Sequence, residues 1–147
     1  MKSSRTVANE FVRLAREARE SLTPMQVLKL TYIAHGWMLA LYHRPLIKDD
    51  VQAWQYGPVI PHLYNAVRKY RSNPVVDVHP VDGEALDDHE RSIIRQVFNR
   101  YGHLSGPALS RLTHAKNTPW EVVYEPGSFG IVIPNDIIED HYASLAE

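Results

Sequence analysis

The stretch that decides the fold runs from Thr23 to Tyr42 and reads TPMQVLKLTYIAHGWMLALY. Thr23 and Gln26 have the spacing of a capping box, and Pro24 falls at the first helical position, where a missing N–H has no cost. From Met25 onward, apolar side chains occur on nearly every side of the helix. A helix of this kind is buried among other elements. We therefore expect a central helix from about Met25 to Tyr42.

Two details of this helix lead to further predictions. Gly36 stands in its interior, where glycine costs roughly 1 kcal/mol relative to alanine. We therefore expect another backbone or an aromatic ring to pack closely against it. The main apolar stripe of the helix comprises Val27, Leu30, Ala34, Trp37 and Leu41.

The flanking segments predict a mainly α fold, α+β with a few short strands, in which a compact helical bundle surrounds the central helix. Apolar residues recur at helical spacing in six further segments, and caps or prolines mark where most of these begin. The segments cover residues 7–18, 61–70, 88–101, 105–114, 120–125 and 135–142. The expected buried face of the 88–101 helix comprises Ile93, Ile94, Val97, Phe98 and Tyr101.

Three other segments lack helical periodicity. Residues 51–56 are rich in strand formers and predict a short strand or hairpin arm, with Gly57-Pro58 as the turn. Residues 130–133 are a second candidate strand. Residues 72–84 contain Pro74, Pro80 and Gly83, so we expect an extended surface loop there.

Composition favours one ordinary globular domain over membrane or nucleic-acid classes. The chain has 147 residues, a formal net charge of -1 and no cysteine. Without cysteine there is no disulfide or thiolate metal site, which fits a reducing compartment, and we expect a cytoplasmic protein. No apolar run approaches the ~20 residues of a membrane span. The near-neutral charge gives no general attraction to phosphate backbones, so nucleic acid is not the expected partner.

Motifs that carry chemistry are missing from the sequence. There is no glycine-rich phosphate loop and no G-x-S-x-G elbow. The eight histidines never occur as H-x-x-x-H, the spacing that would join two metal ligands on a helix. We therefore predict no catalytic residue, no cofactor and no metal site.

Two groups of residues have both a structural and a functional interpretation. Asp49-Asp50 and Asp87-Asp88 are paired acids, but both pairs stand where carboxylates commonly cap helices, so capping is favoured over acid–base chemistry. Aromatic residues either fill the core or anchor a partner. We expect Trp37 in the core, and more open positions for Trp54 and Trp120, which flank predicted turns.

Three blocks of sequence belong together. They are LKLTYIAHGW at residues 28–37, AWQYGPVIP at 53–61, and LSRLTH at 109–114 followed by Pro119-Trp120. In this order and spacing they resemble the Panacea antitoxin domain, the family of SocA-like and phage-associated GepA-like proteins. The resemblance spans about Thr23 to Trp120, and we expect a single Panacea-like domain over residues 1–147. The family-like positions are Lys29, Tyr32, Trp37, Trp54, Tyr56, Gly57, Pro58, His114 and Trp120, which either bind a partner or hold the domain together.

The resemblance implies an antitoxin of bacterial or prophage origin. Such a protein neutralises a cognate toxin by direct binding, and different family members meet unrelated toxins. One branch resembles a proteolytic adaptor that delivers its toxin to a Clp-type protease. The family fold, largely helical with small strands, agrees with the pattern of elements above.

Two rival functions remain open. The first is a hydrolase or transferase that uses His114 or another histidine, which predicts a pocket joining that histidine to a carboxylate. The second is a nucleic-acid-binding regulator that uses Arg13, Arg16 and Arg19, or the basic run from Arg68 to Arg71.

Overall fold

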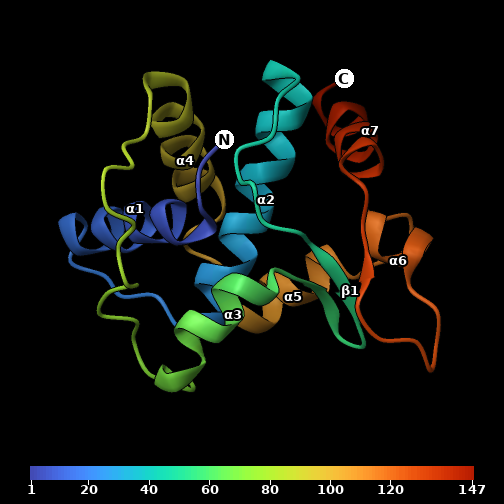
Figure 1. Cartoon of the computed structure of the whole chain (residues 1–147), viewed down its shortest axis with the longest axis horizontal. Helices are drawn as coiled ribbons and strands as arrows, with labels where there is room; N and C mark the ends of the chain where they lie inside the picture. The colour runs from blue at the N-terminus through green and yellow to red at the C-terminus, as the bar shows by residue number, and fades with distance from the viewer.

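The computed structural model describes residues 1–147 and has the expected mainly α architecture with one small sheet (Figure 1). Its helices are α1 (Ser4–Glu17), α2 (Pro24–Tyr42), α3 (Pro61–Val67), α4 (Asp88–Tyr101), α5 (Gly106–Thr113), α6 (Pro119–Val123) and α7 (Asn135–Ala146), and a 3-10 turn, Arg68–Tyr70, follows α3. The strands are β1 (Gln52–Trp54), β2 (Gly57–Val59) and β3 (Ile131–Val132). None of the helices combines the length and the apolar character needed to cross a bilayer.

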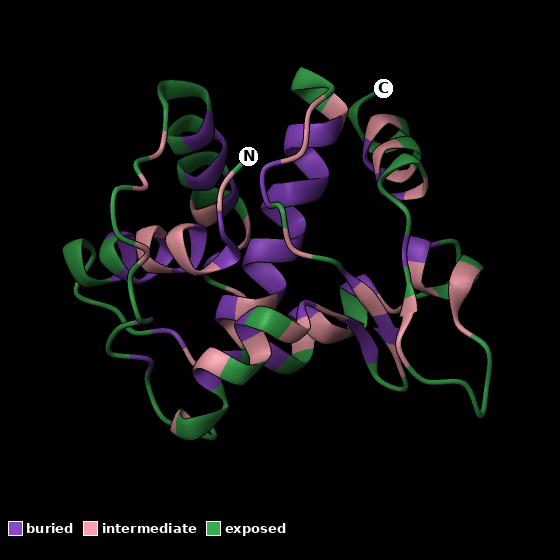
Figure 2. Cartoon of the chain, viewed as in Figure 1, coloured by how far each residue is buried: buried purple, intermediate pink, exposed green.

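Helix α2 forms the centre of the fold, as its apolar sequence predicts. The helices α1, α3, α4, α5 and α7 all touch it, and Figure 2 shows it buried over most of its length. The predicted capping box between Thr23 and Gln26 is present, and His43 ends the helix in the left-handed conformation. The prediction that Leu41 belongs to the buried stripe is wrong, because Leu41 is 47% exposed. Leu41 and Tyr42, in the last turn of α2, are both exposed.

A close approach of two helices explains the glycine inside α2. A Cβ on Gly36 would lie 2.3 Å from two ring carbons of Tyr142, which comes from α7. The Tyr142 ring also packs edge-on against Trp37, with ring centroids 5.3 Å apart. The prediction of an aromatic ring against Gly36 is therefore confirmed, and Trp37 lies in the core as expected.

A buried histidine joins α2 to two other segments. His35 Nδ1 accepts from the backbone N–H groups of Leu46 and Ile47, at 3.3 and 3.4 Å, and Nε2 lies 3.0 Å from Asn135 Oδ1. Two donors on Nδ1 leave Nε2 as the protonated nitrogen, so the neutral ring satisfies every contact. Burial lowers the pKa of His35 to about 4.

The sheet is antiparallel, in the order β2-β1-β3. Trp54 pairs with Gly57, so the hairpin turn consists of Gln55 and Tyr56. The prediction of a turn at Gly57-Pro58 is therefore wrong by two residues, since both belong to β2. Pro58 is tolerated there because β2 is an edge strand.

Three further helices begin at the predicted caps. Asp87 and Glu90 form a capping box at α4, and Ser105 and Thr118 cap α5 and α6. Asp49 accepts a 2.6 Å hydrogen bond from the backbone N–H of Ser4 at the start of α1. Both predicted acidic pairs thus place one carboxylate at a helix N-terminus.

Two expectations about burial need correction. Residues 72–84 form no regular element, but Val75 and Val78 are buried against the core, so the segment is only partly a surface loop. Asn9 of α1 holds this segment with both ends of its amide, which bond the carbonyl and N–H of Val78 at 2.6 and 2.8 Å. Phe98 and Tyr101, which the sequence predicts on the buried face of α4, are only partly buried.

Candidate functional site

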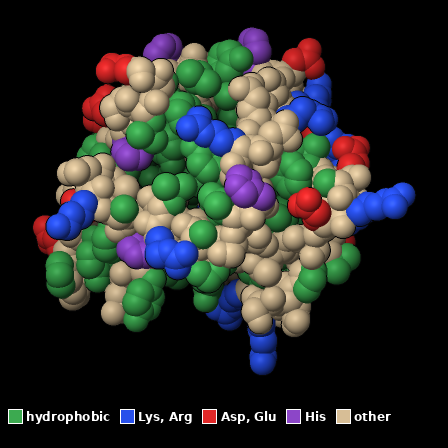
Figure 3. All heavy atoms as spheres, turned by 180° about the vertical axis from the view of Figure 1, so that it is seen from behind, with side chains coloured by type: hydrophobic (Ala, Val, Ile, Leu, Met, Phe, Trp, Pro, Cys, Tyr) green, Lys and Arg blue, Asp and Glu red, His purple; other side chains and the backbone are tan.

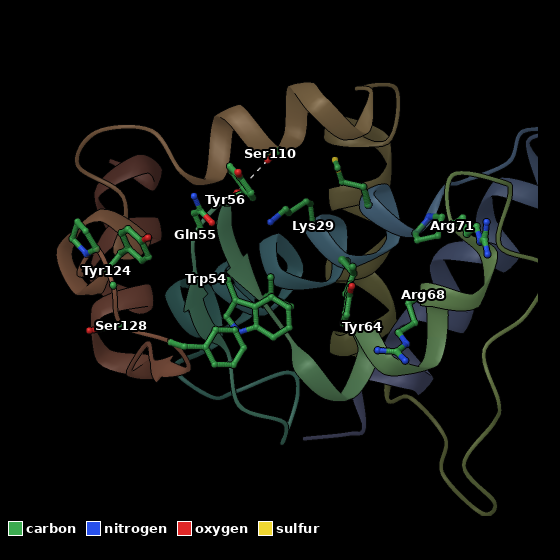
Figure 4. Close-up of a pocket in the computed structure, with 17 residues that line it drawn as sticks. Lys29, Trp54, Gln55, Tyr56, Tyr64, Arg68, Arg71, Ser110, Tyr124 and Ser128 are labelled. Carbon is green, nitrogen blue, oxygen red and sulfur yellow. Dashed lines mark hydrogen bonds between the residues drawn. The ribbon is translucent and has the colours of Figure 1, made fainter.

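A groove of about 860 Å³ opens between the first half of α2, the β1–β2 hairpin, α3 and the segment that follows α6. Figure 4 shows Lys29 of α2 pointing toward the hairpin. Arg68 and Arg71 lie toward one end of the groove, and Tyr124 and Ser128 toward the other. The groove therefore joins segments that are far apart in the sequence.

Lys29 links α2 to the hairpin. Its side chain is buried, with 6% of the residue exposed, and Nζ donates a 2.7 Å hydrogen bond to the backbone carbonyl of Pro58. Burial lowers the pKa of Lys29 to about 8. A charged amine taken out of water without a carboxylate partner is destabilised, which is the physical reason for the lowered pKa.

Gly57 makes room for this contact. Its φ of +129° belongs to a region that residues with side chains rarely adopt. A Cβ at this position would lie 3.1 Å from Lys29 Nζ and 3.5 Å from the Cβ of His114. The lysine amine and the histidine both lie on the side where a Cβ would point, and the absence of a side chain at Gly57 lets the amine approach the strand closely.

Trp120 supports the hairpin from α6. Its indole N–H donates a 2.6 Å hydrogen bond to the backbone carbonyl of Trp54. The Trp120 ring stacks on Tyr124, with centroids 4.7 Å apart, and meets the edge of His114 at 5.7 Å. These contacts fix the strand that carries Trp54 into the groove.

Aromatic side chains form the wall and rim of the groove. The Trp54 ring lies between Tyr64 and Phe129, with centroid distances of 5.3 and 5.1 Å. Tyr56, in the turn, is 75% exposed and Phe129 is 77% exposed. Exposed aromatic residues gathered around a hollow are typical of surfaces that bind another protein.

Comparison with known proteins assigns the chain to a family. A family described as "Antitoxin SocA-like, Panacea domain" matches residues 27–121, well over half of the chain. The chain belongs to this Panacea family. Antitoxin SocA of Caulobacter vibrioides (strain NA1000 / CB15N) is 28% identical over 153 residues, which cover 95% of this chain and 81% of that protein. No solved structure matches the chain.

The nine positions singled out by the sequence resemblance separate into two groups in space. Seven of them line the groove or support its hairpin: Lys29, Trp54, Tyr56, Gly57, Pro58, His114 and Trp120. Tyr32 and Trp37 instead pack against Tyr142 of α7, at centroid distances of 6.3 and 5.3 Å. The Tyr32 hydroxyl is buried without a hydrogen-bond partner, and burial raises its pKa. This second group belongs to the core.

Several groove residues fall outside these nine positions. Met25, Tyr64, Arg68, Arg71 and Phe129 also line the groove. The two arginines stand out in the sequence only as a basic run, and that pattern favours nucleic acid over a protein partner. Phe129 carries no sequence signal, because it enters the groove through the irregular segment between α6 and β3.

His114 does not have the surroundings that the enzyme hypothesis predicts. Its Nδ1 lies 3.4 Å from Ser110 Oγ, and its ring meets Trp120. The structure places no carboxylate in hydrogen-bond or ion-pair contact with His114. No group of three or more His, Asp or Glu residues is arranged to hold a metal ion.

Two of the arginines proposed for nucleic-acid binding, Arg13 and Arg16, have partners within the chain. Arg13 forms ion pairs with Glu10 and Glu17 at 2.7 and 2.6 Å, and Arg16 donates to the carbonyl of Val76 at 2.9 Å. On the face shown in Figure 3, basic side chains are spread singly among acidic and apolar ones. These observations do not favour a phosphate-binding surface on α1 or on that face.

Proposed function

We propose that this chain is an antitoxin that neutralises a protein toxin by binding it at the groove. Membership of the Panacea family and the similarity to Antitoxin SocA support an antitoxin role. One observation supports the groove assignment: Lys29, Trp54 and Ser110, one from each of the three sequence blocks, line a single groove with exposed aromatic residues on its rim.

The neighbouring gene provides the direct test. Expressed alone, its product should stop growth, and co-expression of this chain should restore growth. The two proteins should co-purify as a complex. A harmless neighbour, or a toxic neighbour that is neither rescued nor bound, would contradict the proposal.

The toxin can be neutralised by two routes, and the half-life of the toxin distinguishes them. A simple inhibitor blocks the toxin without changing its lifetime, whereas a proteolytic adaptor shortens that lifetime in cells with an active Clp-type protease. We propose binding as the step common to both routes. The toxin's half-life after a block of protein synthesis, with and without this chain and with and without the protease, distinguishes them.

A rival activity can be tested on the same preparation. An enzyme that uses His114 would turn over a substrate without the toxin, and His114→Gln would abolish the turnover. The contacts of His114 with Ser110 and Trp120 instead support a structural role next to the hairpin. We therefore propose that His114→Gln changes toxin binding only by shifting the hairpin.

A further inference from the structure

The amine of Lys29 has unused hydrogen-bonding capacity. A lysine ammonium carries three N–H donors. One of them meets the carbonyl of Pro58 at 2.7 Å, and no other hydrogen bond or ion pair involves this amine. Buried ammonium groups are normally paired with an acid. Lys29 is therefore a buried cation at the wall of an open groove without its usual partner.

The groove as a whole has one sign of charge. Its charged side chains are Lys29, Arg68 and Arg71, and no Asp or Glu lines it. The rest of the lining is mainly aromatic, aliphatic and hydroxyl-bearing. Figure 4 shows Lys29 near the hairpin and the two arginines toward one end. An occupant that complements this surface combines apolar groups with negative charge.

We infer that the groove receives an acidic, apolar polypeptide segment and that one carboxylate of this segment pairs with Lys29 Nζ. The inference rests on the proposed function, since it gives the chemistry of the toxin segment that the groove recognises. Apolar side chains of the segment pack on Trp54 and Phe129, while Arg68 and Arg71 attract its remaining negative charge. A charge-assisted hydrogen bond to the carboxylate supplies the partner that Lys29 lacks.

The arrangement favours a carboxylate over a nucleic-acid backbone. Nucleic-acid affinity comes from several cations that neutralise successive phosphates along a path. Here one cation is recessed beside the hairpin, and the other two lie together on the 3-10 turn and directly after it. This geometry suits a peptide segment with one carboxylate at Lys29 and further acidic residues near Arg68 and Arg71.

The test measures the pKa of Lys29 by NMR on lysine-labelled protein. The titratable or charged groups around the groove and hairpin are Tyr56, Tyr64, Arg68, Arg71, Tyr124 and His114. Saturating N-acetylphenylalanine, which has one carboxylate and one aromatic ring, should raise the pKa of Lys29 by about one unit, equivalent to roughly tenfold tighter binding to the charged amine. N-acetylphenylalaninamide, which lacks the charge, should leave it unchanged.

Two variants keep the result interpretable. Lys29→Met retains the side-chain length and should weaken binding of the carboxylate probe about tenfold, the effect of losing a charge-assisted hydrogen bond. Arg71→Gln leaves the buried amine in place and should weaken the probe less than Lys29→Met does. The exposed Lys116 is the internal control, and its NMR signal should not move when the probe is added.

Other outcomes overturn the inference. Equal effects of the carboxylate and the amide, or no effect of either, would show that Lys29 does not receive a carboxylate. A larger shift with inorganic phosphate or with a ten-residue oligothymidylate would assign the groove to phosphate groups. Growth rescue by the wild-type chain uses none of these probes and tests the proposed function separately. If the chain rescues growth but the pKa of Lys29 does not respond to the carboxylate, this inference is wrong and the antitoxin role still stands.

Discussion

The ring of Tyr142 occupies the space that a side chain at position 36 would need, because a Cβ on Gly36 would lie 2.3 Å from two of its carbons. This relationship locks α7 onto α2. Gly36→Ala should lower the free energy of unfolding by about 1 to 3 kcal/mol through overpacking. Denaturant unfolding measures the change.

The same relationship supplies its own control. Replacing Tyr142 with Leu removes the ring, so Gly36→Ala should be less damaging in that background than in the wild type. Additive losses in the double mutant would mean that the two residues do not share the space.

Replacing Tyr56 tests toxin binding separately from folding. Because its side chain is 75% exposed, Tyr56→Ala should change the free energy of unfolding by less than about 0.5 kcal/mol. An anchor at a protein interface contributes about 2 kcal/mol or more, so toxin affinity should fall by more than tenfold. Calorimetric titration with the toxin measures this loss. The matched control is Tyr42→Ala, an exposed tyrosine at the far end of α2, which should bind like the wild type.

Trp120 tests how the hairpin is held. Trp120→Phe removes the N–H that bonds the carbonyl of Trp54, and it should cost about 1 kcal/mol of stability. Trp54→Phe removes a bond to the side chain of Gln52 in the same strand and keeps an aromatic ring between Tyr64 and Phe129, so its loss of stability should be smaller. A larger loss for Trp54→Phe than for Trp120→Phe would contradict the supporting role of Trp120.

His35 predicts a loss of stability in acid. Its pKa falls from an ordinary 6.5 to about 4 on folding, so the folded state favours the neutral ring. The unfolded chain binds the extra proton first, and stability therefore declines as pH falls from 6.5 toward 4. The decline should reach a few kcal/mol, since each pKa unit corresponds to about 1.4 kcal/mol. The exposed His103→Gln variant should retain this decline.

The lowered pKa of Lys29 predicts a change in stability at alkaline pH. Its pKa falls from 10.5 to about 8 on folding, so below pH 8 the folded state carries an unfavourable charge. Between pH 8 and 10.5 the folded protein releases this proton before the unfolded chain does, and stability contributed by this group rises. Unfolding curves of wild type and Lys29→Met, compared at pH 7.5 and 10, should show the wild type gaining relative to the variant. A constant difference would contradict the lowered pKa.

Local signals predicted most of the fold. The capping residues of α2, α4, α5 and α6 act through bonds to residues three positions away, so their spacing is visible in the sequence. The hairpin turn was misplaced because Gly57-Pro58 suits a turn and an edge strand equally well, and the choice depends on Lys29 and His114 packing against Gly57. The exposure of Leu41 could not be predicted, because the helical period shows which face is apolar but not how far along the helix that face is covered.

The groove was only partly predictable. The family resemblance singled out Lys29, Trp54 and Tyr56 but not the space between them. Arg68, Arg71 and Phe129 reach the groove from separate segments, and no local pattern indicates such convergence. The absence of acids from the lining likewise became visible only in three dimensions.

Pro58 limits how any protein can attach to the sheet. It stands in the middle of the edge strand β2, it has no N–H, and Lys29 occupies its carbonyl oxygen. An incoming chain therefore finds no continuous ladder to extend, and fibril-like stacking along this edge is blocked. Recognition at the hairpin must then depend on side chains. Single substitutions can change these side chains while the backbone of the hairpin stays the same.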